Sequence, residues 1–294
     1  MVAAFGEILF DVFPEQELLG GAPFNFLYHI QALTGNGRFI SRIGNDERGG
    51  VIRAFLQQHS IDQQYVQIDL HRPTGTAVVQ VNSEGIPSFT ITEESAYDYI
   101  EYSSDSARGL LNCEMLYFGT LAQRNEMSRS TLHQLSRTAD RCFFDVNLRQ
   151  QYYSAEILHQ SFVLADIVKL NTEELERVHA LFFSTRFSMD SAPGELMEKF
   201  SLSHLAVTMG ENGSWMWMPE GKHFHRTAAP RMVDTVGAGD GFAAVMCAGI
   251  LKNLPLKTIH RLASEFSAAL CGIQGALPPD SEFYLPYKKA LCDE

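Results

Sequence analysis

A glycine-rich stretch ending at residue 240 combines residue types and spacing that favour chemistry on an anionic group. Gly237, Ala238 and Gly239 precede Asp240, and the apolar, small-residue segment 243–251 that follows is predicted to be helical. Two glycines at a helix start let successive backbone N–H groups turn toward one point, and the helix dipole adds to their attraction for an anion. Asp240 falls in the first turn, where the dipole keeps its carboxylate ionised and able to accept a proton. The stretch therefore predicts an anion hole beside a carboxylate base, which suits phosphoryl transfer to a hydroxyl.

Spacing separates this stretch from two other phosphate-binding loops. A dinucleotide-binding fingerprint needs glycine at position 242, where the chain has Phe242, so a dinucleotide-binding oxidoreductase is disfavoured. A P-loop needs Gly-Lys followed by Ser or Thr, and that triplet occurs nowhere in the sequence. A glycine-rich helix start with Asp240 as a capping residue remains open on spacing alone, because short motifs have many false positives.

Short apolar segments alternate with longer segments of helical pattern along much of the chain. The predicted strands are residues 1–9, 38–43, 114–118, 141–145, 165–170 and 205–209, and the predicted helices are residues 24–33, 47–59, 127–139, 154–164 and 172–182. The alternation predicts an α/β fold with a mainly parallel sheet covered by helices on both faces. Ligands of such sheets bind beyond the carboxyl ends of the strands, where several of these segments are followed by polar residues.

Residues 72–102 depart from this alternation. Segments 76–81 and 88–92 are rich in β-forming residues, and residues 82–85 between them have a hairpin-like turn sequence. With part of 10–20 they are expected to form a small sheet, which serves either as a lid over the site or as a plain antiparallel edge. We therefore expect one domain over residues 1–294 with this small sheet appended.

Composition restricts the partners of the chain. Its 294 residues carry 23 Lys and Arg against 35 Asp and Glu, a formal net charge of −12, which argues against binding to nucleic acid or to an anionic membrane surface. The odd number of cysteines, five, indicates no disulfide framework. The N-terminal residues lack the basic and apolar pattern of a signal peptide, so a cytoplasmic location is expected.

The stretch from Asp234 to Asp240 resembles the C-terminal signature of the PfkB, or ribokinase-like, family of carbohydrate kinases. The family's N-terminal signature is matched by residues 20–25, Gly-Gly-Ala-Pro-Phe-Asn. Further matches follow in the family's order at residues 42–46, Asp145-x-Asn147-x-Arg149, Asn171-x-x-Glu174, residues 207–213 and Gly275-Ala276. The resemblance covers nearly the whole chain and implies a ribokinase-like three-layer sandwich with a mainly parallel central sheet and a small β-sheet lid.

The resemblance also implies roles for residues around the anion hole. Asp240 would deprotonate the sugar hydroxyl, while the amides of Gly237, Ala238 and Gly239 would stabilise the transferred phosphoryl group. The positions that match sugar contacts are Asp11, Gly21 and Asn25, with Arg149 close to substrate or phosphate. Taken individually, Asp11 is equally a loop carboxylate and Asn25 a helix cap.

Nucleotide and metal positions follow from the same resemblance. Asn171, Thr208, Gly210, Gly213, Gly237 and Gly239 match positions beside ATP. Asn171 and Glu174 match the motif that holds Mg²⁺ through water, although the same pair forms a capping box that needs no metal, and both roles can coexist. Asp234 and Thr235 are the candidates for the monovalent cation, K⁺, that members of the family often hold.

Several stretches look most like the fructokinase branch, including residues 73–77, 96–98, 118–122 and 145–149. No Lys or Arg occurs in residues 1–37 or 73–107, and the second region carries Glu84, Glu93, Glu94, Asp98, Glu101 and Asp105. An anionic sugar would be repelled there, so a neutral sugar, fructose first, is expected. Arg149 is the exception, since it could pair with one anionic group. The alternatives are a 2-keto-3-deoxygluconate kinase or a nucleoside kinase of the same family, or a sugar-binding regulator without activity.

Two aromatic residues of the expected lid, Tyr97 and Phe89, are candidates to cover the sugar, although aromatic residues on a small sheet more often pack or form an interface. By analogy with the family, the lid is also expected to pair with that of a second subunit and form a homodimer.

Overall fold

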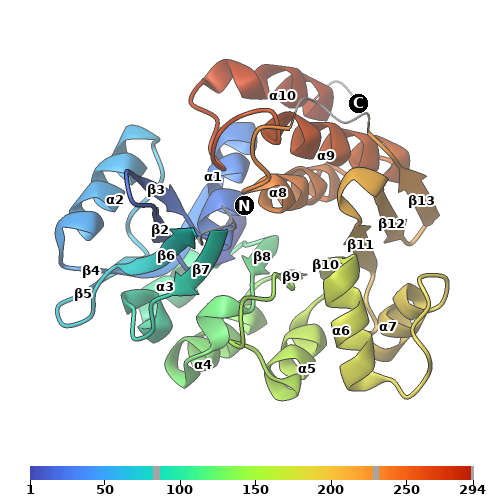
Figure 1. Cartoon of the computed structure of the whole chain (residues 1–294), viewed down its shortest axis with the longest axis horizontal. Helices are drawn as coiled ribbons and strands as arrows, with labels where there is room; N and C mark the ends of the chain where they lie inside the picture. Colours follow the sequence, from blue (N-terminus) through green and yellow to red (C-terminus); the bar gives the residue numbers. More distant parts are fainter. Residues whose placement is uncertain (82–86, 228–231, 293–294) are drawn as a thin grey trace.

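Within residues 1–81, 87–227 and 232–292, which the structure describes (79–81 and 87–89 by their backbone alone), nine strands form a large central sheet (Figure 1). The computed structural model orders them as β13 (Gly221–His225), β12 (Ser214–Met218), β11 (His204–Thr208), β10 (Ile167–Asn171), β9 (Cys142–Asp145), β8 (Met115–Phe118), β1 (Val2–Phe5), β4 (Gly37–Gly44) and β5 (Val66–Asp69). The strands from β11 to β5 pair in parallel, and β12 and β13 extend the sheet in antiparallel fashion. The predicted mainly parallel α/β fold is confirmed.

The side chains of the large sheet alternate between two apolar cores on opposite faces. In β8, Met115 and Tyr117 join one core, whereas Leu116 and Phe118 join the other. Helices on both faces explain why these strands are apolar throughout. The first core lies against α1 (Ala22–Thr34), α2 (Glu47–Gln58), α8 (Ala238–Leu251), α9 (Leu256–Leu270) and α10 (Leu285–Cys292). The second lies against α3 (Ser104–Gly109), α4 (Glu126–Leu135), α5 (Ala155–Leu164), α6 (Thr172–Phe182) and α7 (Ala192–Phe200). Figure 1 shows α8 to α10 on one side of the sheet and α4 to α7 on the other.

The first predicted strand, residues 1–9, is wrong as a single element. β1 ends at Phe5, and the chain leaves the large sheet at Gly6, whose φ is 141°. A Cβ at Gly6 would lie 2.7 Å from Cγ of Pro23, so only glycine allows α1 to pack this closely. After this break the chain enters the small sheet at β2 (Leu9–Val12). Glu7 therefore lies in the link between the two sheets.

The small sheet consists of β3 (Glu17–Gly20), β2, β6 (Gly75–Val81) and β7 (Pro87–Ile91), in that order. β2 and β6 pair in parallel, and the other two pairs are antiparallel. The predicted contributions of segments 10–20, 76–81 and 88–92 are confirmed. The predicted turn at 82–85 and the side chain of Phe89 lie outside the described residues.

Helix starts agree with the predictions at several places. α6 begins and ends at the predicted residues, and α1 has a proline in its first turn, where a missing N–H costs nothing. α8 begins at Ala238, earlier than the predicted residue 243.

All five cysteines are free. Among the described residues, no helix is long and apolar enough to cross a membrane.

Candidate active site

Two cavities adjoin at the carboxyl ends of the parallel strands. The small-sheet cavity, of about 640 Å³, lies between the small sheet, α1 and the start of α8. The α9 cavity, of about 800 Å³, lies between the 208–214 segment and α9. The two cavities share five lining residues: Asn171, Glu173, Thr208, Thr235 and Gly239. A group bound in one cavity can therefore meet a group bound in the other at the start of α8.

The first turn of α8 forms the wall at this junction. Gly237 is its N-cap, with φ 77°, and a Cβ there would lie 2.4 Å from Cβ of Ala276. The N–H of Ala238 donates to the carbonyl of Thr235 at 3.3 Å. The N–H groups of Gly239 and Asp240 belong to the helix start, where no carbonyl of the preceding turn can accept them. These two amides, more than that of Ala238, are free to hold an anion.

Asp240 occupies the first turn of α8, as predicted, and lines the small-sheet cavity. Its Oδ2 accepts a hydrogen bond of 2.8 Å from Nδ2 of Asn25, which orients the carboxylate. Burial and, to a lesser extent, the nearby Asp145 raise the pKa of Asp240 to about 6, against the opposing effects of Asn25, Lys169 and Arg149. A carboxylate of that pKa is ionised at neutral pH and is a better proton acceptor than an ordinary aspartate.

The expected sugar-binding residues Asp11, Gly21, Asn25 and Arg149 all line the small-sheet cavity. Burial raises the pKa of Asp11 to about 6, an effect opposed by Arg149. Gly21 has a packing reason as well, since a Cβ there would lie 2.7 Å from the carbonyl oxygen of Glu7. Arg149 is exposed, on a loop whose neighbours Asn147 and Gln150 have positive φ. The fold thus brings Arg149 beside three residues of the N-terminal segment.

Tyr97 is the one expected sugar-binding residue that the structure does not bring to the cavity. Its side chain is fully buried, its hydroxyl accepts from Nη2 of Arg124 at 3.1 Å, and its ring lies where a Cβ on Gly75 would clash. The ring packs the small sheet onto the main body. It is absent from the described lining of the small-sheet cavity.

The described acidic residues of segment 73–107 are likewise absent from the lining of the small-sheet cavity. Asp98 pairs with Arg124 and Glu101 with Arg42, and neither lines the small-sheet cavity. Glu84 lies outside the described residues. Contrary to the expectation, these acids do not frame the cavity, because Asp98 and Glu101 pair with arginines from other segments of the chain.

Asn171 and Glu174 form a capping box at the start of α6. Oδ1 of Asn171 accepts the N–H of Glu174 at 2.8 Å, and Oε2 of Glu174 accepts the N–H of Asn171 at 2.9 Å. Oε1 of Glu174 accepts the N–H of Leu148 at 2.8 Å. Among the described residues, no cluster of three or more His, Cys, Asp and Glu side chains could hold a metal by itself. Because Mg²⁺ usually keeps several waters and takes its other ligands from one or two carboxylates and substrate phosphates, these oxygens fit such an ion through water.

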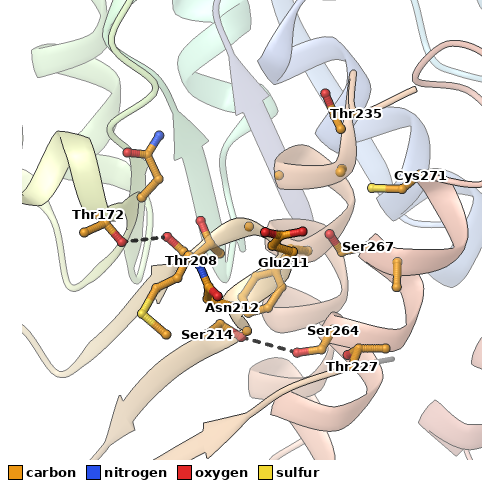
Figure 2. A pocket seen from close by; sticks show the side chains of 18 of the residues that line it. Thr172, Thr208, Glu211, Asn212, Ser214, Thr227, Thr235, Ser264, Ser267 and Cys271 are labelled. Atoms are coloured by element: carbon orange, nitrogen blue, oxygen red, sulfur yellow. Dashed lines mark hydrogen bonds between the residues drawn. The ribbon is translucent and has the colours of Figure 1, made fainter. Parts of the chain in front are cut away.

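The α9 cavity is lined by Thr208, Gly210 and Gly213, as expected for nucleotide positions. Gly213 has φ 97°, and a Cβ there would lie 2.4 Å from the carbonyl oxygen of His225, so glycine is required. Figure 2 shows the hydroxyl groups of this cavity, including Ser214, which lies 3.4 Å from the Oγ of Ser264. Its described lining contains no Lys or Arg. An anion there must rely on backbone amides, a helix end and a metal ion.

The two residues expected to hold a monovalent cation, Asp234 and Thr235, differ in whether they line a cavity. Oδ1 of Asp234 accepts the N–H of Val236 at 3.1 Å, and Oδ2 accepts the N–H of Gly275 at 3.0 Å. This carboxylate shapes the turn before α8 and lines neither cavity as described. Thr235 lines both cavities.

Four charged residues of the small-sheet cavity escaped the sequence reasoning: Glu7, Lys169, Glu173 and Arg177. Lys169 and Glu7 carried a readable signal, because a lone charge inside an apolar segment must be compensated. Burial raises the pKa of Glu7 to about 7, and its Oε2 has no hydrogen-bond partner among the described residues. Glu173 and Arg177 are exposed on α6 and look in sequence like any solvated helix face.

Comparisons with known proteins agree with this geometry. The model of the pfkB family carbohydrate kinases matches residues 7–282. A fructokinase of Klebsiella pneumoniae is 30% identical over an alignment of 302 positions that covers 97% of this chain and 96% of that protein. An uncharacterized sugar kinase of Pyrococcus horikoshii, solved in complex with ATP, superposes with a TM-score of 0.82 at 25% identity, covering 99% of each chain.

A fructokinase of Vibrio cholerae, solved with fructose, ADP and potassium, superposes with a TM-score of 0.77 at 22% identity over 97% of each chain. The family model covers both cavities, the start of α8 and the small sheet. The chain therefore belongs to the pfkB family of carbohydrate kinases.

Proposed function

We propose that this chain is an ATP-dependent kinase that phosphorylates a hydroxyl of a neutral sugar, with fructose as the first choice. The observation that carries the proposal is the position of Asp240 beside the amides at the start of α8, where the two cavities meet. ATP would occupy the α9 cavity and the sugar the small-sheet cavity, so that the γ-phosphoryl group reaches the junction.

Each step follows from groups of this chain. Asn25 holds Oδ2 of Asp240, which leaves Oδ1 to take the proton of the sugar hydroxyl. The sugar oxygen then bonds to the γ-phosphorus, and the bond to the bridging oxygen breaks with its electron pair left on ADP. The amides of Gly239 and Asp240 stabilise the charge that collects on the phosphoryl oxygens, and the helix dipole adds to them.

Mg²⁺ would be held through water by Asn171 and Glu174 together with the nucleotide phosphates. When bound, it supplies positive charge to the phosphates of a cavity that has no described Lys or Arg. The capping box keeps both side chains in place whether or not the ion is present.

The choice of sugar is supported by the relatives and by the cavity. The fructokinase of Klebsiella pneumoniae is similar over nearly the whole chain, and the Vibrio cholerae fructokinase of the same fold was solved with fructose. Asp11 and Asn25 offer an acceptor and a donor, as a polyol demands. The small sheet would act as the lid, because Asp11, Ala77 and Ile91 from its strands line the cavity.

A second candidate is a kinase of a sugar acid such as 2-keto-3-deoxygluconate. Arg149 and Arg177 are exposed cations that line the small-sheet cavity, and either could pair with a carboxylate.

Dependence on potassium and a dimer formed through the small sheet remain predictions. Activity in KCl compared with tetramethylammonium chloride would check the first, and the mass of the protein in solution would check the second.

The test is ADP release with MgATP over a panel of fructose, 2-keto-3-deoxygluconate, ribose, inosine and fructose 6-phosphate. We expect the highest kcat/KM with fructose. A preference for the sugar acid would move the assignment to the second candidate, and a preference for inosine would assign a nucleoside kinase. Absence of turnover on the whole panel, with MgATP binding intact, would favour a regulator without activity.

A further inference from the structure

Lys169 is a buried cation at the bottom of the small-sheet cavity, and no motif in the sequence gave it a role. It stands in β10 between the apolar residues Val168 and Leu170, and its side chain is 9% exposed. A buried ammonium group is costly unless opposite charges and hydrogen bonds compensate it, so its position needs a reason.

The ammonium group is held in one orientation by its neighbours. Its Nζ donates to both carboxylate oxygens of Asp145, at 3.0 and 2.9 Å, and the hydroxyl of Tyr117 donates to Oδ2 of the same carboxylate at 2.9 Å. Burial by itself would lower the pKa of Lys169, but the carboxylates of Asp145, Glu174 and Asp240 together raise it. Lys169 is therefore a permanent charge. Asp145 occupies two of its three N–H groups, which leaves one for the cavity.

The Nζ atom of Lys169 lies next to the first turn of α8. A Cβ built on Gly239 would lie 3.0 Å from Nζ, closer than an ordinary contact, so the ammonium group stands directly beside the helix start. Gly239 lines both cavities, whereas Lys169 lines the small-sheet cavity. The other cations that line this cavity in the described chain, Arg149 and Arg177, are exposed.

On the basis of the proposed kinase function, we infer that Lys169 is a catalytic residue whose ammonium group contacts the phosphoryl group during transfer. Asp145 and Tyr117 are positioning residues that aim it. Lys169 keeps its proton throughout: the hydroxyl proton goes to Asp240, the sugar oxygen bonds to phosphorus, and the bridging electron pair leaves with ADP. The ammonium offsets negative charge on the phosphoryl oxygens from within the small-sheet cavity.

The kinetic test uses Lys169→Met, which keeps the length of the side chain, and Lys169→Arg, which keeps the charge. We expect K169M to lower kcat about 10²- to 10³-fold, as for loss of one anion-hole donor, with little change in the KM of ATP. K169R should recover part of the loss. A kcat of K169M within threefold of the wild type would overturn the inference.

A double variant separates catalysis from a structural ion pair. K169M leaves the carboxylate of Asp145 buried without its partner, and this alone should lower the melting temperature. Adding Asp145→Asn removes the stranded charge and should restore stability. A catalytic cation predicts that turnover stays low in the stable double variant, whereas a structural pair predicts that turnover returns with stability.

A third measurement needs no knowledge of the sugar. ADP, Mg²⁺ and aluminium fluoride together mimic the phosphoryl group in transfer, and they should raise the melting temperature of the wild type more than ADP and Mg²⁺ do. K169M should lose this extra increase and keep the response to ADP and Mg²⁺. An undiminished extra increase in K169M would overturn the inference, even if the sugar panel has already displaced fructose.

Discussion

The two cavities at the sheet edge differ in how they meet a ligand. The small-sheet cavity is lined by charged side chains from several elements, namely Glu7, Asp11, Arg149, Lys169, Glu173, Glu174, Arg177 and Asp240. The described lining of the α9 cavity has Glu173 and Glu211 as its charged residues and is otherwise made of glycines, hydroxyl groups, two asparagines and apolar side chains. The larger cavity, expected to take the more highly charged ligand, is thus the one without cations.

This difference follows from the two tasks. A polyol is recognised by side chains that reach individual hydroxyls and by a carboxylate of suitable pKa, and a strand, two helices and a loop supply these side chains here. A triphosphate is bound by amides at a helix start and by a metal ion. The rest of the cavity wall can then be apolar and contact the adenine ring. Lys169 belongs to the first cavity and lies where it meets the second.

The largest loss of turnover should come from replacing Asp240, the proposed proton acceptor in the small-sheet cavity. Asp240→Asn keeps the shape and the bond to Asn25 but cannot take a proton, so kcat should fall by about 10³-fold or more. The melting temperature increase caused by MgATP should remain, because the α9 cavity is untouched. Near-normal turnover in this variant would refute the assignment of Asp240 and the chemical division between the cavities.

Gly237→Ala tests whether backbone amides at the start of α8 bind the phosphoryl group. Its Cβ would lie 2.4 Å from Cβ of Ala276, so the first turn of α8 must shift and kcat should fall about 10²-fold. The matched control is Gly35→Ala, at φ 67° with nothing within 4 Å, which should cost about 1–2 kcal/mol of stability and leave turnover unchanged. Equal losses of turnover in both variants would mean that backbone strain, not the anion hole, is responsible.

Asp11→Asn probes the sugar side without touching the base. Loss of a hydrogen bond to a charged group should raise the KM of the sugar about 10- to 100-fold and leave the KM of ATP unchanged. Glu17→Gln is the control, since Glu17 lies in the same small sheet but is exposed and pairs with Arg48. An equal change in both substrates' KM would show that the cavities are not independent.

The pH profile should report Asp240. Its pKa is raised from 3.8 to about 6, so kcat/KM for the sugar should fall about tenfold per pH unit below 6 and level off above it in the Asp11→Asn variant, and more steeply in the wild type, where Asp11 also has a pKa of about 6. The charged groups that act most strongly on Asp240 are Asp145, Lys169 and Arg149, and Asp240 also interacts with the buried Glu7. Removing the charge of Asp145 should move the midpoint to lower pH. A wild-type midpoint near 4 would contradict a desolvated base.

The variant with the smallest expected effect on turnover, Glu7→Gln, concerns stability. The pKa of Glu7 is about 7 in the folded chain against 4.5 ordinarily, so the folded state binds the proton more tightly and the free energy of unfolding falls as pH rises through this window. Glu7→Gln has no carboxylate to ionise, so it should raise the free energy of unfolding by up to about 3 kcal/mol at pH 8 and by much less below pH 5. Urea unfolding at both pH values measures it. Glu198→Gln, exposed on α7, should show no such difference.

The sequence predicted the site better where a motif implied a local conformation than where it depended on distant partners. Asp240 lies in the first helical turn as predicted, and Asn171 and Glu174 form the capping box that was one of two interpretations. Tyr97 was misplaced because its partner, Arg124, comes from another element. The acids of 73–107 were misread for the same reason, since Asp98 and Glu101 are neutralised by arginines outside that segment.

By itself, the sequence determined the alternation of strands and helices, the glycine-rich start of α8 and the order of motifs that place the chain in its family. These are local properties, set by side-chain periodicity and by backbone positions that only glycine fills. The tertiary structure alone decided which charges face the cavity and which find partners. Lys169 shows the reason: Asp145, Tyr117 and Gly239 lie 24, 52 and 70 residues away along the chain, and only the packing of β8, β9, β10 and α8 brings them to one ammonium group.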